Sequence, residues 1–223
     1  IAIIEKANEI GSHALSGAVV DPKTLIELFP DYELDSFPFE APVHTEKMYF
    51  LSKGGSKIGF PYIPKGMSHH GCYVASLGKL TRWLGQKCEE EGIDIFCPFS
   101  GDEILYDENN SVIGIRTGDR GIDKNGNHKP NYEQGVDIKA KVTIFGEGTR
   151  GSLTKQLISK FNLMKDKNPQ VWAVGVKELW KVPEGTIKPG YVAHTLGHPL
   201  GNKIFGGGFI YGMENNILDI GLV

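Results

Sequence analysis

The sequence predicts an α/β chain that changes to mainly β structure near its end, and three observations favour this class. Residues 1–4 form a short, continuously apolar run, which is typical of a buried parallel strand. Over Tyr73–Glu91 apolar residues recur at three- and four-residue steps, as in an amphipathic helix. From Gln170 onward apolar and polar residues alternate, which indicates further strands.

Length and composition fit a folded protein with this organisation. The chain has 223 residues, of which 40% are hydrophobic and 23% charged, so it has enough apolar material for a core. We expect a first domain at 1–165 and the beginning of a second domain at 166–223. The net charge is −3 and no run of basic residues interleaves with aromatics, which argues against a nucleic-acid partner.

The cysteines, the apolar runs and the chain ends give further expectations. Cys72, Cys88 and Cys97 are far apart and form no CxxC pair, so we expect reduced thiols and no zinc or iron–sulfur site in this stretch. Every apolar run is shorter than the ~20 residues that cross a bilayer. The chain begins at Ile1 without a Met or a signal-peptide pattern and stops abruptly at Val223, so we expect a piece of a longer protein.

In the first half of the chain the sequence predicts a helix at 23–29, short strands at 48–51 and 58–60, and a helix at 73–91. Asp21 and Pro22 resemble an N-cap followed by proline at the first helical position, which predicts the start of the first helix. Residues 30–70 are rich in proline and turn residues, so little other regular structure is expected there. Gly92 is expected to end the second helix.

In the second half the sequence predicts a strand at 93–96, a hairpin of 103–107 and 112–117, a buried strand at 142–145 and a helix at 152–161. Asn109-Asn110 is the expected hairpin turn. Residues 118–135 are expected to form a polar excursion.

Two segments in the first domain have the composition of ligand-binding loops. Glu5 ends the first strand, where an acidic residue of a dinucleotide-binding unit accepts hydrogen bonds from ribose hydroxyls, although by itself it fits an ordinary solvent-facing Glu. In the loop 10–18, two glycines bracket small residues, and His13 and Ser16 could donate hydrogen bonds to ring or phosphate oxygens. A simple Gly/Ser loop fits that loop about as well.

Two further glycine-rich segments lie later in the chain. Residues 146–148 turn from the predicted strand into the helix, which would present free N–H groups and a positive helix end to an anionic or ribityl ligand. An ordinary turn capped by Ser152 is the alternative. Residues 206–208, between aromatic residues, could form a floor without side chains for a planar ring, or simply a hairpin or bulge.

Several other residues are expected to be structural. His69 and His70 are adjacent, and adjacent side chains rarely converge on one metal ion, so a polar loop is expected. The three tryptophans are expected in the core, namely Trp83, Trp172 and Trp180. The apolar cluster at 25–29 is usually core, and it is also the best candidate for a membrane-dipping helix.

Together, several short motifs carry a resemblance over essentially the whole chain. They are Ile3-Ile-Glu-Lys-Ala7, Leu15-Ser-Gly-Ala18 followed by Asp21-Pro22, Glu27-Leu-Phe-Pro-Asp31, His70-Gly71, Leu77-Gly-Lys-Leu80, Lys141-Val-Thr-Ile-Phe-Gly-Glu-Gly148, Gly175-Val-Lys-Glu-Leu-Trp180, His194-Thr-Leu-Gly197 and Gly206-Gly207. In this order they resemble the electron transfer flavoprotein-ubiquinone oxidoreductases. The resemblance implies an FAD/NAD(P)-binding Rossmann-like domain of the glutathione-reductase/geranylgeranyl-reductase type, plus a mainly β (α+β) ubiquinone-binding domain.

The resemblance also implies roles for individual residues. The residues implied to lie near FAD are Glu5 at the adenosine ribose, His13, Leu15, Ser16 and Gly17 near the flavin, and Glu147 and Gly148 near the ribityl and pyrophosphate part. Gly206 and Gly207 are implied to line the ubiquinone site. No catalytic residue and no metal ligand is implied within this chain, because the cofactors carry the redox chemistry. A [4Fe-4S] cluster is implied in the full-length protein, with ligands outside this chain.

The implied partners are electron transfer flavoprotein, ubiquinone and a membrane surface, on which residues 10–31 would dip into one leaflet. The implied location is the mitochondrial inner membrane, on its matrix face, or a bacterial cytoplasmic membrane. His198, Gly146, Gly208 and Gly212 depart from the family pattern, the last two beside the quinone loop. We expect this 223-residue piece to bind FAD poorly by itself.

Two alternatives remain open from the sequence. One is another FAD-dependent reductase or monooxygenase of the geranylgeranyl-reductase-like family. The other is a non-enzymatic membrane-surface adaptor that keeps the fold but not the flavin.

Overall fold

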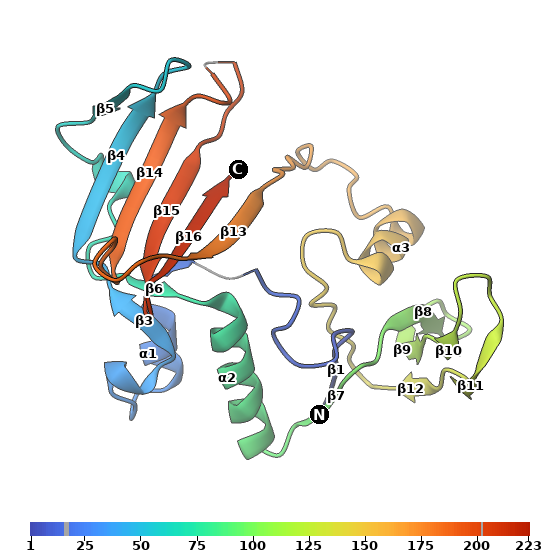
Figure 1. Cartoon of the computed structure of the whole chain (residues 1–223). Coiled ribbons are helices and arrows are strands. Elements are labelled where there is room, and N and C mark those ends of the chain that lie inside the picture. Colours follow the sequence, from blue (N-terminus) through green and yellow to red (C-terminus); the bar gives the residue numbers. More distant parts are fainter. Residues whose placement is uncertain (16–17, 202) are drawn as a thin grey trace. The chain divides into compact units, whose positions relative to one another are not determined.

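The computed structural model describes residues 1–15, 18–201 and 203–223, and these form two compact units (Figure 1). Unit 1 comprises Ile1–Ile10 and Cys88–Val171, and unit 2 comprises Gly11–Lys87 and Trp172–Val223. The predicted division placed residues 11–87 in the first domain, whereas their contacts group them with the end of the chain.

A two-stranded parallel sheet opens unit 1. Strand β1 (Ala2–Ile4) pairs with β7 (Asp94–Phe96), with Ile3 opposite Ile95. The parallel strand predicted at 1–4 and the strand predicted at 93–96 are therefore both present. The first is not buried, however, because Ala2 and Ile3 are exposed and Ile4 is only partly buried.

The core of unit 1 lies between an antiparallel sheet and one helix. Its strands are β8 (Gly101–Tyr106), β9 (Val112–Thr117) and β12 (Asp137–Lys139), in the order β12-β9-β8. Helix α3 (Ser152–Phe161) buries Leu153 against Ile104 and Ile115. The hairpin and this helix form where they were predicted, and Asn110 takes the positive φ of 62° that the turn requires.

Two segments of unit 1 differ from the expectation. The polar stretch 118–135 contains a second hairpin, β10 (Arg120–Ile122) with β11 (His128–Glu133). The strand predicted at 142–145 is wrong: Val142 and Ile144 are 75% and 90% exposed, and no described strand pairs with the segment. Apolar composition cannot form a strand unless another backbone pairs with it.

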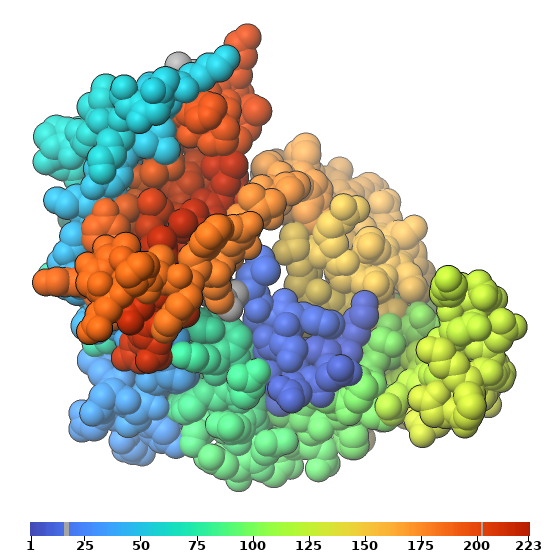
Figure 2. Space-filling model, in the orientation of Figure 1, coloured from blue at the N-terminus to red at the C-terminus, as the bar shows by residue number. Residues whose placement is uncertain are grey.

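Unit 2 is built around a six-stranded sheet in the order β13-β16-β15-β14-β4-β5. The strands are β4 (Thr45–Leu51), β5 (Lys57–Gly59), β13 (Val176–Lys181), β14 (Tyr191–Gly197), β15 (Gly208–Met213) and β16 (Ile217–Leu222). Strand β4 runs parallel to β14 throughout its length, and Figure 2 shows its blue-cyan atoms against the orange and red strands. The strands predicted at 48–51 and 58–60 are therefore present as β4 and β5, and β4 begins three residues earlier than predicted.

A second layer packs on this sheet. Its strands are β2 (Ala18–Val20), β3 (Phe39–Pro42) and β6 (Tyr73–Ala75), in the order β2-β6-β3. Val74 in β6 is fully buried against Val192, Tyr211 and Met213 of the large sheet. This burial explains why residues 73–75 form a strand and not the first turn of the predicted helix.

Helix α2 (Leu77–Glu90) therefore begins four residues later than predicted, after Ser76, whose Oγ accepts a hydrogen bond from the N–H of Lys79 at 3.4 Å. Gly92, with φ of 74°, follows its end as predicted. Helix α1 (Lys23–Leu28) also forms, and Asp21 accepts a bond from the N–H of Lys23. Short 3₁₀ turns lie at Leu34–Ser36 and Lys65–Met67.

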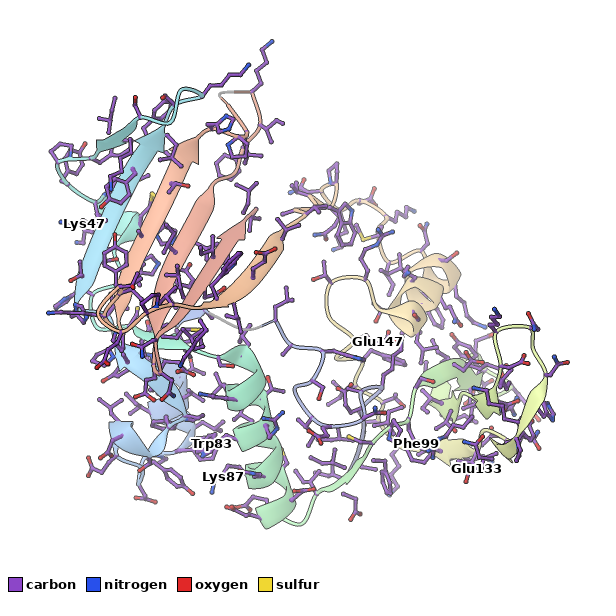
Figure 3. All side chains as sticks on the ribbon, in the orientation of Figure 1. Lys47, Trp83, Lys87, Phe99, Glu133 and Glu147 are labelled. Carbon is purple, nitrogen blue, oxygen red and sulfur yellow. The ribbon has the colours of Figure 1, made fainter. Side chains whose placement is uncertain are left out.

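The three predicted core tryptophans have different environments. Trp83 packs with Phe29 and Phe37 in an apolar cluster, and the ammonium of Lys87 lies 5.6 Å from its ring centroid (labelled in Figure 3). Trp172 and Trp180 are 52% and 55% exposed, so that part of the prediction was wrong. Within the described residues, no helix is long and apolar enough to span a bilayer.

Candidate functional site

Glu5 follows β1 and turns its carboxylate back onto its own loop. Its Oε1 accepts a hydrogen bond from the N–H of Ala7 at 2.6 Å. Its backbone is fixed as well, because its N–H donates to the carbonyl of Phe96 and its carbonyl accepts from Phe99. In the described part of the chain no donor bonds to Oε2, so one carboxylate oxygen remains for a ligand.

Glu147 lies on the loop that leads into α3 (Figure 3) and caps that helix. Its Oε1 accepts from the N–H of Leu153 at 3.1 Å, and its Oε2 accepts from the N–H and the hydroxyl of Thr154 at 2.6 and 2.7 Å. Burial raises the pKa of this carboxyl, but the bonds from Thr154 and the helix N–H groups outweigh it and hold the pKa below the usual value. Ser152 is not the cap.

The glycines around Glu147 fall into two kinds. An added Cβ at Gly151 would overlap the Glu147 side chain, so this glycine lets the carboxylate reach the helix. An added Cβ at Gly146 or Gly148 would meet no atom within 4 Å. Two of the helix N–H groups that were expected to be free are therefore occupied, while the outer side of the glycine turn is open.

The loop before β2 is only partly described. Gly11 packs closely on the carbonyl of Gly78 in α2, with φ of 80°. His13 is exposed and Leu15 is 67% exposed. Ser16 and Gly17, which were also expected near a ligand, lie outside the described residues.

The glycines at 206–208 are packed by the chain's own backbone. An added Cβ would overlap the carbonyl oxygen of Val223 at Gly206 and that of Thr195 at Gly207. Gly207 exchanges two hydrogen bonds of 2.9 Å with Val223, and the N–H of Gly208 donates to Thr195 Oγ1 at 3.1 Å. The glycines thus allow close strand approach, and the N–H groups of Gly207 and Gly208 already have partners.

A group of polar side chains that sequence reasoning missed links β4, β14 and β15. His69 donates to Glu46 Oε1 through its N–H at 2.7 Å and through ring Nδ1 at 2.8 Å. The rings of His69 and His194 stack with centroids 5.2 Å apart, and His194 Nε2 lies 3.2 Å from the hydroxyl of Tyr211. His69 was noticed only beside His70 in the sequence, where nothing signals its partner in β4.

A buried ion pair lies on the next strands. Lys177 Nζ is 3.3 Å from Asp219 Oδ2, and the Asp219 side chain is fully buried. Burial raises the pKa of Asp219, and the neighbouring ammonium acts in the opposite direction.

The structure brings together only some of the residues expected to bind a ligand. Within unit 1, Glu5 and Glu147 flank one core, since Ile4 and Leu153 both lie near Gly101. Gly148 follows directly on the same loop. His13, Leu15, Gly206 and Gly207 belong to unit 2.

Comparison with known proteins gives the family of the chain. Residues 172–223 match the family model "ETF-QO, ubiquinone-binding". Over its whole length the chain is 44% identical to a mitochondrial electron transfer flavoprotein-ubiquinone oxidoreductase of Dictyostelium discoideum, covering 36% of that protein. It is 43% identical to the electron transfer flavoprotein-ubiquinone oxidoreductase of Pseudomonas aeruginosa, covering 41% of it. The chain belongs to the electron transfer flavoprotein-ubiquinone oxidoreductase family.

Solved structures agree with the predicted fold of this family. A geranylgeranyl bacteriochlorophyll reductase-like protein from Thermoplasma acidophilum matches 98% of the chain with a TM-score of 0.56 at 17% identity, over 49% of its own length. A probable FAD-dependent monooxygenase from Pseudomonas aeruginosa matches 99% of the chain with a TM-score of 0.57 at 9% identity, over 52% of its length. The expected combination of an α/β FAD-type fold with a β domain is thus confirmed.

Proposed function

We propose that the full-length protein is an FAD-dependent oxidoreductase that passes electrons from reduced electron transfer flavoprotein to ubiquinone in a respiratory chain. The observation that carries this proposal is the 44% identity, over the whole chain, to a relative of that name. The chain spans about a third of that relative's length, 36%, so the activity is proposed for the whole protein.

FAD fits the polar groups of unit 1. Glu5 Oε2 is available to accept hydrogen bonds from the ribose hydroxyls, and the glycine turn at Gly146 and Gly148 leaves space for a ligand next to its backbone. Glu147 holds that turn against α3. FAD, when bound, supplies the electron-carrying chemistry, and the residues of the chain bind and orient it.

In unit 2, the residues assigned to the flavin by the family resemblance lie on the loop before β2. His13 and Leu15 are exposed and can meet a ring, and Ser16 and Gly17 are assigned to this role from the family resemblance alone. The proposed membrane surface contact lies in the same region, at 10–31, where Ile26 and Leu28 are 39% and 63% exposed.

Ubiquinone is proposed to lie against Gly206 and Gly207. Because the Gly207 N–H is bonded within the sheet, the glycines would contribute a surface without side chains and not a new hydrogen bond. Apolar neighbours favour a hydrophobic ring there, since Ile204 is 60% exposed and Phe205 fully exposed. The further family features are proposed for the whole protein: a [4Fe-4S] cluster with ligands outside this chain, and attachment to one face of the mitochondrial inner membrane or of a bacterial membrane.

The test uses the full-length protein. Purified protein should be yellow with stoichiometric FAD, and should reduce a soluble ubiquinone analogue when reduced electron transfer flavoprotein is the donor. Glu5→Gln should weaken FAD binding about tenfold, through a weaker charge-assisted bond to ribose, while the exposed Glu108→Gln should not change it.

Other outcomes would identify the alternatives. A flavoprotein that hydroxylates a substrate or reduces a carbon–carbon double bond, and leaves quinone oxidised, would be a reductase or monooxygenase of the same fold. A colourless protein that still binds vesicles would be a membrane-surface adaptor. Either outcome refutes the proposed function.

A further inference from the structure

A long exposed segment runs along one edge of the large sheet in unit 2. Strand β5 is the last strand of that sheet, and within the described residues β4 is its only neighbour (Figure 1). We call residues 53–67, which contain β5 and the turns on both sides of it, the β5 segment. Every residue of this segment is exposed except Ile63, which is partly buried.

The β5 segment lies in a long stretch without acidic residues. No Asp or Glu occurs between Glu46 and Glu89, although the whole chain has a net charge of −3. The basic residues of the segment are Lys53, Lys57 and Lys65, all exposed. The carboxylate of Glu46, on the neighbouring strand, is bonded to residues 68 and 69. The segment therefore forms a local positive surface on a chain that is acidic as a whole.

The same segment also exposes large apolar side chains. They are Ile58, Phe60, Tyr62 and Met67, with exposed fractions from 41% to 71%. Single apolar side chains on a protein surface are common, but four within ten residues form a patch. Exposed apolar patches with polar residues around them mark protein or membrane interaction sites.

Pairing with β4 determines how the basic and apolar side chains are arranged. Lys57 and Ile58 pair with successive residues of β4, so their side chains point to opposite faces of the sheet. The N–H of Phe60 donates to the carbonyl of Met48 at 2.9 Å, which continues the pairing and places Phe60 on the same face as Ile58. On the other face the ammonium of Lys57 lies 4.9 Å from the ring centroid of Tyr49. A partner that meets this edge therefore contacts basic and apolar side chains together.

Protection of a sheet edge explains only part of this composition. A short edge strand, lysines and prolines all prevent pairing with another strand, and Pro61 and Pro64 have no N–H to donate. Such protection does not require Ile58, Phe60 and Tyr62 to be in water. The apolar side chains therefore indicate an occupant that contacts side chains without adding a strand to the sheet.

We propose that the β5 segment binds the surface of a membrane that contains anionic lipids. A bilayer supplies anionic headgroups for the lysines and, directly below them, an apolar layer for the apolar side chains. Lysine side chains can reach headgroups while their stems cover apolar surface, and tyrosine is enriched at the boundary between headgroups and acyl chains. The inference rests on the membrane attachment in the proposed function, and it adds to residues 10–31 a second segment of unit 2 and a preference for anionic lipid.

The first test measures co-sedimentation of the full-length, FAD-loaded protein with vesicles. Normal protein should bind vesicles of phosphatidylcholine with phosphatidylglycerol more tightly than vesicles of phosphatidylcholine alone, and high salt should reduce this difference. The triple variant Lys53→Gln, Lys57→Gln, Lys65→Gln should bind the anionic vesicles about 100-fold more weakly, at about fivefold per lysine. Its binding to phosphatidylcholine alone should be unchanged.

A matched control removes the same charge from unit 1. The triple variant Lys124→Gln, Lys129→Gln, Lys165→Gln changes three exposed lysines of that unit and should bind both kinds of vesicle normally. Unchanged FAD content and an unchanged unfolding temperature in both triple variants would show that any loss of binding is local.

A second pair of variants tests the apolar side chains. Phe60→Ser combined with Tyr62→Ser should weaken binding to both kinds of vesicle about tenfold, because burial of apolar surface does not depend on headgroup charge. Leu28→Ser, within residues 10–31, should also weaken binding to both kinds but should keep the full preference for anionic vesicles.

The outcomes separate this inference from the proposed function. If the triple variant of the β5 segment keeps the full preference for anionic vesicles, the inference is refuted, while the contact at 10–31 and quinone reduction are not. If that variant binds vesicles normally but needs more electron transfer flavoprotein for half-maximal rate, the segment binds a protein and the inference is refuted.

Two further outcomes are decisive. If an amine-reactive reagent does not label Lys53, Lys57 and Lys65 in the full-length protein without vesicles, the rest of the protein covers the segment and the inference fails. A protein that binds vesicles as expected but does not reduce quinone refutes the proposed electron transfer and supports the lipid contact.

Discussion

Removal of the Glu147 carboxylate should loosen the first turn of α3, with consequences for the proposed flavin loop. In the structure this one side chain satisfies the N–H groups of Leu153 and Thr154 and the Thr154 hydroxyl. Loss of an N-terminal helix cap costs about 1 kcal/mol. A change of that size corresponds to about fivefold more opening of the turn.

Hydrogen exchange measured by NMR or mass spectrometry on the full-length protein can detect this change. We expect the amides at 153 and 154 to exchange about fivefold faster in Glu147→Ala. In the same variant, amides at the far end of α3 should exchange at the normal rate. In the control Glu108→Gln, which changes an exposed residue of the same unit, the amides at 153 and 154 should also exchange at the normal rate.

The effect should also depend on pH. Because the hydrogen bonds from Thr154 and the helix N–H groups outweigh burial, the folded-state pKa of Glu147 lies below its unfolded value. The carboxylate therefore stabilises the turn fully above the unfolded pKa, and this stabilisation is lost as the pH falls through the folded pKa. Glu147→Gln should differ from the normal protein at neutral pH and converge with it as the pH falls below the folded-state pKa of Glu147. Equal exchange at 153 and 154 in the normal protein and Glu147→Ala would refute the capping role.

Three other predictions concern unit 2. Gly207→Ala should disrupt the pairing with Val223 because its Cβ overlaps a backbone carbonyl, and faster amide exchange at Val223 with FAD content unchanged would confirm a local effect. Val74→Ala should lower the unfolding free energy of unit 2 by about 1.6 kcal/mol, for two buried methyl groups at about 0.8 each, as measured by denaturant titration. Lys177→Met should destabilise by about 3–5 kcal/mol because it leaves the buried Asp219 carboxylate unpaired, and adding Asp219→Asn should restore most of that loss in the same titration.

The sequence predicted those elements whose stability is local. Helix α3 occupies the predicted range, and the β8–β9 hairpin turns at Asn110. Both could be predicted because the residues that specify each element lie within a few positions of one another in the sequence. Residues 73–75 were predicted as helix since their apolar spacing continues that of α2. Only the burial of Val74 against a strand from the far end of the chain selects a strand there.

The candidate site shows the same division. Glu5 could be predicted because it directly ends an apolar strand. The group of polar side chains from Glu46 to Tyr211 could not, since its four members come from separate elements and β4 meets β14 only in the folded sheet. Its sequence neighbours gave no periodic signal, and the adjacent His70 suggested only a polar loop.

The glycines of this chain can be sorted by what fills the space that a side chain would need. At Gly151 the space that a Cβ would need is occupied by the Glu147 carboxylate, and at Gly207 it is occupied by the Thr195 carbonyl. The presence of glycine at these two positions therefore does not indicate a ligand. Gly146 and Gly148 face open space. Gly148 also has φ of 73°, a left-handed conformation that favours glycine, so its backbone alone accounts for the residue type. The Cβ of an alanine at 146 would meet no atom, so packing within the chain does not explain why this position is a glycine. The flavin proposal therefore depends most on the turn before α3. The quinone proposal depends on the exposed side chains of Ile204 and Phe205 more than on the glycines beside them.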